Sequence, residues 1–127
     1  MNIKNTDEKI LTLTAARADV LDLCKMIDLA AYIDPVILNV DEQVRSRLLQ
    51  QFMIFSGEPK DTVTFRLALD ELHDLSQILE GVNVVDTDDI FDKGTRNIPA
   101  DHRMQSLTEN VTGLYEQLYE QFRVSFQ

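Results

Sequence analysis

Residues 62–82 read TVTFRLALDELHDLSQILEGV, and apolar residues recur along them at intervals of three and four. That period predicts an α-helix with one buried face. Asp61 or Thr62 is a suitable N-cap for this helix, and Gly81 is its expected C-terminal cap. The expected buried face consists of Phe65, Ala68, Leu72, Leu75, Leu79 and Val82.

The same period extends toward the N-terminus and predicts a first helix over 6–33. Asn5 and Glu8 have the spacing of a capping box at its start. Pro35 ends it, because the residue before a proline is disfavoured in the helical conformation. The expected buried face of this helix is Leu13, Ala16, Val20, Leu23, Ile27 and Ala30.

A second helix follows, and its start has two alternatives. Either Pro35 occupies the first helical position with Asp34 as the cap, or a short irregular piece precedes a helix capped by Asp41. Gly57 predicts its end. Its apolar side is Val44, Leu48, Phe52 and Phe55.

The last helix is expected to begin between residues 99 and 106 and to run nearly to residue 127. Its apolar face is Met104, Leu107, Val111, Leu114 and Leu118. The connection over 83–100 contains apolar residues, so we expect it to pack against the body. The predicted fold is therefore all-α, a single domain over 1–127. Its four helices form a bundle without a sheet, with a long structured connection between the third and fourth helices.

Composition narrows the class of function. The chain has 127 residues, one Cys and a formal net charge of −10. One Cys excludes a disulfide scaffold, and the negative charge argues against direct nucleic-acid binding. The sequence shows neither a signal peptide nor an apolar membrane span, so we expect a cytoplasmic protein without a membrane partner.

Acidic residues are concentrated in one segment. No Lys or Arg lies between Arg66 and Lys93, so this segment carries eight of the negative charges. Concentrated acidic charge attracts basic partner surfaces, including a groove that normally holds nucleic acid. The alternative is a solvated face that only keeps the protein soluble. The acidic residues are Asp70, Glu71, Asp74, Glu80, Asp86, Asp88, Asp89 and Asp92.

Aromatic residues form a second line on the last helix, beside its apolar face. Tyr and Phe suit partner surfaces, although core packing is the simpler interpretation of this line. The candidate interface residues are Tyr115, Tyr119, Phe122 and Phe126. The partner here is either another protein or a second copy, which would give a homodimer.

Two short patterns bear on metal chemistry. Asp70 and His73 share a helix face, but a di-iron bundle needs a second such pair, which the chain lacks. Glu71 and Asp74 form Glu-x-x-Asp, which resembles half of the motif of MazG-like nucleotide pyrophosphohydrolases, an all-helical family. The resemblance implies magnesium-dependent phosphoryl chemistry. That family has a second carboxylate pair upstream, where this chain has Glu42 and Arg45.

The sequence thus favours a non-enzymatic acidic interaction protein that binds and inhibits or escorts another macromolecule. Inhibitors, immunity proteins, anti-defence proteins and assembly chaperones share this profile. We expect a protein partner with a basic surface, and no cofactor or metal. The alternative is a metal-dependent pyrophosphohydrolase that uses Glu71 and Asp74.

Overall fold

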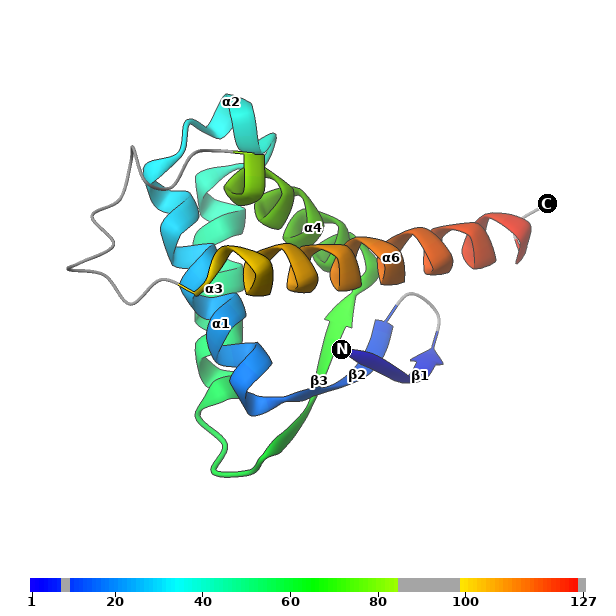
Figure 1. Ribbon diagram of the computed structural model, residues 1–127. Helices are drawn as coiled ribbons and strands as arrows, with labels where there is room; N and C mark the ends of the chain where they lie inside the picture. The colour runs from blue at the N-terminus through cyan, green and yellow to red at the C-terminus, as the bar shows by residue number, and fades with distance from the viewer. Residues whose placement is uncertain (8–9, 85–98, 126–127) are drawn as a thin grey trace.

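The computed structural model describes residues 1–7, 10–84 and 99–125. Two strands open the chain, a run of helices follows, and a third strand precedes the last helices described (Figure 1). The elements are β1 (Asn2–Asp7), β2 (Ile10–Ala16), α1 (Arg17–Leu29), the 3-10 helix η1 (Ala30–Tyr32), α2 (Pro35–Leu38), α3 (Glu42–Ser56), β3 (Thr62–Ala68), α4 (Leu69–Val84) and α6 (Asp101–Ser125).

A three-stranded antiparallel sheet in the order β1-β2-β3 shows that the all-α prediction is wrong. The central strand β2 pairs with β3 without a bulge, and Leu13 lies opposite Phe65. The pairing of β1 with β2 shifts register between Ile3 and Asn5. The fold is therefore a mostly helical α+β arrangement, with the helices and the sheet sharing one core.

The first predicted helix is wrong over its N-terminal part. The structure places β1 and β2 there, and α1 begins only at Arg17. Asn5 lies in β1 and caps no helix, while Glu8 lies outside the described residues. In β2, Leu11, Leu13 and Ala15 are buried, which is the alternation of a strand with one face in the core.

The third predicted helix is also wrong at its start, since 62–68 form β3 and the helix begins at Leu69. Val63, Phe65 and Leu67 are buried, and the residues between them are exposed. This period of two coexists with the helical spacing, because Phe65, Ala68 and Leu72 also fit a period of three and four. The β-branched and aromatic residues favour a strand here, and pairing with β2 fixes that choice.

Both predicted starts of the second helical region occur in the structure. The Asp34 carboxylate accepts a hydrogen bond from the Val36 N–H at 3.0 Å and caps the short helix α2. Asp41 then caps α3, and its carboxylate accepts from the Gln43 N–H at 3.2 Å. The expected apolar side of α3 is confirmed, because Leu48 and Phe52 are buried and its other members pack against the core.

Gly81 does not end its helix as predicted, since α4 continues to Val84. The glycine instead lies where α2 and α4 come into close contact. A Cβ atom at position 81 would lie 2.5 Å from Cδ2 of Leu38, which is buried on α2. Gly81 therefore lets α2 approach α4.

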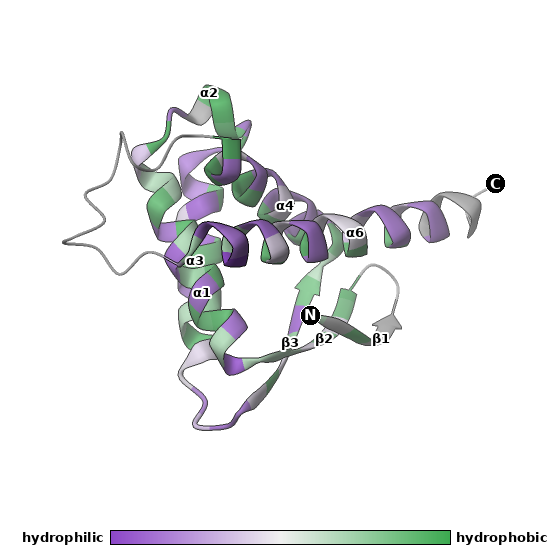
Figure 2. Cartoon of the chain, viewed as in Figure 1, coloured by the Kyte–Doolittle hydropathy of each residue, from purple (hydrophilic) through white to green (hydrophobic). Residues whose placement is uncertain are grey.

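The core lies between the sheet and the helices. Phe52 and Phe55 of α3 meet Phe65 of β3, with ring centroids 4.8–5.6 Å apart. The predicted face of α6 is confirmed, because Met104, Leu107, Val111 and Leu118 are buried and Leu114 is half-buried. Hydrophilic residues dominate the side of α6 that faces the viewer in Figure 2.

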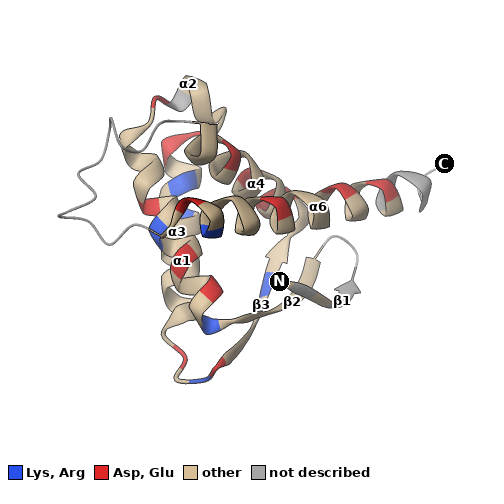
Figure 3. Cartoon of the chain, in the orientation of Figure 1, with Lys and Arg blue, Asp and Glu red and all other residues tan. Residues whose placement is uncertain are grey.

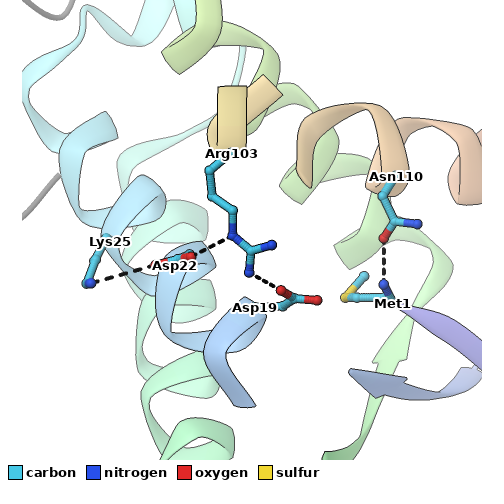
Figure 4. Close-up of polar contacts among 6 residues, drawn as sticks. All are labelled: Met1, Asp19, Asp22, Lys25, Arg103 and Asn110. Atoms are coloured by element: carbon cyan, nitrogen blue, oxygen red, sulfur yellow. Dashed lines mark hydrogen bonds and ion pairs between the residues drawn. The ribbon is translucent and has the colours of Figure 1, made fainter. Parts of the chain in front are cut away.

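Arg103 fastens the start of α6 to α1 (Figure 4). Its Nε atom lies 2.9 Å from an Asp22 carboxylate oxygen, and its Nη2 atom contacts Asp19. Further along α6, Asn110 accepts a hydrogen bond from the Met1 amino group at 2.6 Å. These contacts hold α6 across α1 and the N-terminal strand.

Candidate interaction surface

The acidic start of α4 follows directly from β3. Asp70 and Glu71 lie in the first turn of the helix, where carboxylates are stabilised by the helix dipole. The Glu71 carboxylate accepts a hydrogen bond from the Ala68 N–H at 2.9 Å, as the Glu of a capping box does. Glu71 thus has a structural role at the junction of strand and helix.

Helix α6 packs antiparallel against α4. The amide of Asn83, near the end of α4, donates to the Thr108 hydroxyl in the first half of α6. Glu80 and Thr112 lie next along the pair, with a hydroxyl-to-carboxylate distance of 3.4 Å. This direction carries the second half of α6 past the acidic start of α4.

Tyr115 meets α4 at that point. Its ring centroid lies 4.8 Å from the imidazole of His73 and 6.0 Å from the ring of Tyr119. Burial raises the pKa of the Tyr115 hydroxyl, and the nearby Tyr119 and Asp70 raise it further. Tyr115 is half-buried, while 49% of Tyr119 is exposed, so the tyrosines run from the core edge into solvent.

Asp74 lies among like charges. Burial raises the pKa of its carboxyl, and repulsion from Asp70 and Glu71 adds to this effect. His73 acts in the opposite direction, with its Nδ1 atom 4.0 Å from the carboxylate. In the ranges that the structure describes, no Lys or Arg forms an ion pair with these three carboxylates.

The acidic residues of α4 and the tyrosines of α6 therefore form one surface. We call it the α4–α6 face and define it by Asp70, Glu71, His73, Asp74, Tyr115 and Tyr119. Figure 3 shows acidic residues on both helices. Glu80 is exposed and lies farther along α4. Asp86, Asp88, Asp89, Asp92 and Phe126 lie outside the described residues, as does the side chain of Phe122.

His73 is the member of this face that the sequence does not identify as an interface residue. Its spacing from Asp70 matches only half of a di-iron site, and the chain lacks the second pair. Its contact with Tyr115 joins residues that lie far apart in the sequence, so it depends on how α4 and α6 pack. No sequence signal indicates this contact.

Three observations concern the residues that could take part in metal or nucleophile chemistry in the described part of the chain. It holds no group of three or more His, Cys, Asp and Glu side chains arranged to bind a metal ion. Glu42 is bound by Arg45, whose Nη2 atom lies 2.5 Å from the carboxylate. Burial raises the pKa of the Cys24 thiol, which lowers its thiolate fraction and its reactivity.

Across the described ranges, no helix has both the length and the apolar character needed to cross a membrane. Comparison of the chain with protein-family models, with curated proteins and with solved structures found no match.

Proposed function

We propose that the protein is a non-enzymatic interaction protein whose α4–α6 face binds a basic surface of another macromolecule and inhibits or escorts it. The observation that supports this proposal most is the convergence on one surface of exposed tyrosine and of carboxylates that no Lys or Arg of the described residues neutralises. The carboxylates supply attraction to a basic partner. The tyrosine rings supply apolar area together with a polar hydroxyl, which is a combination common at interfaces.

The pattern of ion pairing supports a role beyond solubility. On α1, Asp19 and Asp22 form ion pairs with Arg103, and Asp22 forms a further one with Lys25. On α4, Asp70, Glu71 and Asp74 have no Lys or Arg partner in the described part of the chain, and their mutual repulsion costs stability. A partner that brings Lys or Arg to this face would remove that cost on binding.

Charge and aromatic contact contribute to binding in different ways. Each exposed ion pair adds only about 0–1 kcal/mol to affinity. Several carboxylates acting together raise the rate of encounter, and this gain falls as salt shortens the Debye length from about 10 Å at 0.1 M to about 3 Å at 1 M. Tyr119 should instead slow dissociation, because a buried aromatic side chain contributes through contact area.

The test is affinity capture from the source cell, followed by binding kinetics with the captured partner. The charge-reversed bait is Asp70→Lys with Glu80→Lys, since both residues are exposed. The control is Glu58→Lys with Asp61→Lys, which makes the same change of net charge at exposed positions between α3 and β3.

We expect the α4 variant to lose association rate at low salt while the control keeps it. Tyr119→Ser should raise the dissociation rate with little effect on association. Equal association rates for the two charge-reversed baits, or rates that do not respond to salt, would refute the proposal. Sedimentation of the protein alone distinguishes a second copy of this chain from a different partner.

A further inference from the structure

The structure contains the same strand–helix unit twice. β2 leads directly into α1, and β3 leads directly into α4, and each strand has seven residues. Leu13 and Phe65 occupy the same position in the two units and lie opposite each other in the sheet, so an approximate two-fold axis relates the two strands. The buried positions match between Leu11, Leu13, Val20, Leu23, Met26 and Ile27 in the first unit and Val63, Phe65, Leu72, Leu75, Ile78 and Leu79 in the second.

A pair of carboxylates occupies the same place in both units. Asp19 and Asp22 are the third and sixth residues of α1. Glu71 and Asp74 are the third and sixth residues of α4. All four side chains are half-buried, so the two pairs resemble each other in spacing, in burial and in their distance from the preceding strand.

The first pair binds a guanidinium group. Arg103 reaches Asp22 through its Nε atom and Asp19 through its Nη2 atom, so one planar group contacts both carboxylates (Figure 4). This arrangement exploits the fixed fork of the guanidinium, which an ammonium group does not possess. Lys25 also approaches Asp22, with its Nζ atom 3.6 Å from the carboxylate, but only the guanidinium of Arg103 contacts both carboxylates.

The second pair has no such ligand within the described residues. Glu71 uses Oε1 to accept from the Ala68 N–H, and its Oε2 atom has no hydrogen bond in that part of the chain. Among those residues, the nitrogen that lies near the Asp74 carboxylate is Nδ1 of His73, at 4.0 Å.

We infer that Glu71 and Asp74 form a guanidinium-binding site for an Arg side chain of the partner. This inference rests on the proposed function and specifies its chemistry, since it requires Arg where a basic surface could equally present Lys. The counterpart of Arg103, which the first unit receives from α6, would then be supplied to the second unit in trans.

The probe is acetyl-Arg-Thr-Arg-amide, with acetyl-Lys-Thr-Lys-amide as its matched analogue. Both peptides are titrated at low salt into the protein, and backbone amide signals are followed by NMR. We expect at least threefold tighter binding of the Arg peptide, with shifts centred on residues 70–75 and a lowered pKa of Asp74. Glu71→Gln with Asp74→Asn should weaken binding at least tenfold, while the amide oxygen introduced at position 71 can still accept from the Ala68 N–H.

Arg103→Ala provides a positive control within the same chain. It removes the guanidinium from the Asp19–Asp22 pair and leaves only Lys25 beside Asp22, so the Arg peptide should then also shift the amides of residues 18–23. Shifts at 18–23 in this variant without shifts at 70–75 would overturn the inference. Equal binding of the two peptides, or unchanged binding by the double variant, would also overturn it.

The outcome for the guanidinium site is separable from the outcome for the proposed function. If Arg103→Ala does not fold, the wild type and the double variant still decide the question. The α4–α6 face could capture a basic partner in a salt-sensitive way and still bind the two peptides equally. That result would leave the proposed function in place and remove the requirement for Arg.

Discussion

Replacing Gly81 by Ala tests the close approach of α2 to α4. The new Cβ atom would lie 2.5 Å from Cδ2 of Leu38 and 3.5 Å from its Cα atom. Leu38 is buried, with 3% of its surface exposed, so its side chain has little room to move away. The substitution should therefore force a shift of α2 or a strained Leu38 rotamer.

Two opposing effects determine how much Gly81→Ala changes the free energy of unfolding. Ala in place of Gly inside a helix stabilises by about 1 kcal/mol, and overpacking costs about 1–3 kcal/mol. Gly81→Ala should then lower the free energy of unfolding by about 0–2 kcal/mol. Leu38→Ala alone should cost about 2–5 kcal/mol. In the Leu38→Ala background the clash is absent, so Gly81→Ala should stabilise by about 1 kcal/mol.

The assay is urea unfolding of the four proteins of this double-mutant cycle, followed by circular dichroism. Gly113→Ala on α6 is the matched control, because no atom lies within 4 Å of the Cβ that it would add. The control should stabilise the protein by about 1 kcal/mol. Equal stabilisation by Gly81→Ala and Gly113→Ala in the wild-type background would refute the proposed contact between α2 and α4.

Three further substitutions test the core, the acidic face and the anchor of α6. Leu72→Ala should lower the free energy of unfolding by about 2–5 kcal/mol, because Leu72 is fully buried. Leu114→Ala should lower it less, because Leu114 is half-buried. Urea unfolding measures both changes. Asp74→Asn should raise the melting temperature at pH 7. The folded-state pKa of Asp74 lies above its ordinary value, so its ionisation costs stability as pH rises through that range. The gain should vanish at a pH below the ordinary Asp pKa, and a gain that persists there would contradict this reasoning. Arg103→Met should lower the free energy of unfolding by about 1 kcal/mol, and this loss should shrink in high salt if repulsion between Asp19 and Asp22 causes it.

The sequence allowed much of the helical structure to be predicted, because buried residues on α3 and α6 keep one helical period throughout. The prediction failed at β2 and β3, because their buried residues fit both the helical spacing of three and four and the strand period of two. Leu13 and Phe65 are buried in the predicted helices and in the actual strands alike. The correct choice depends on the pairing of β2 with β3, which is a contact between distant segments.

The candidate surface was predictable only in its parts. Asp70, Asp74, Tyr115 and Tyr119 are all evident from charge and spacing. Their convergence is not, because it depends on the antiparallel packing of α4 against α6. The role of Arg103 was missed for the same reason, since its partners lie on α1.

The pairing of β2 with β3 also bears on how fast the protein can fold. The two strands are separated in sequence by α1, α2 and α3, so the chain must close a long loop before the sheet can form. Loop closure costs entropy before the strand contacts compensate for it, and proteins rich in such distant contacts fold over milliseconds to seconds, while bundles of local helices fold in microseconds to milliseconds. Refolding should therefore be slower than the helical content suggests, with the helices able to form ahead of the sheet.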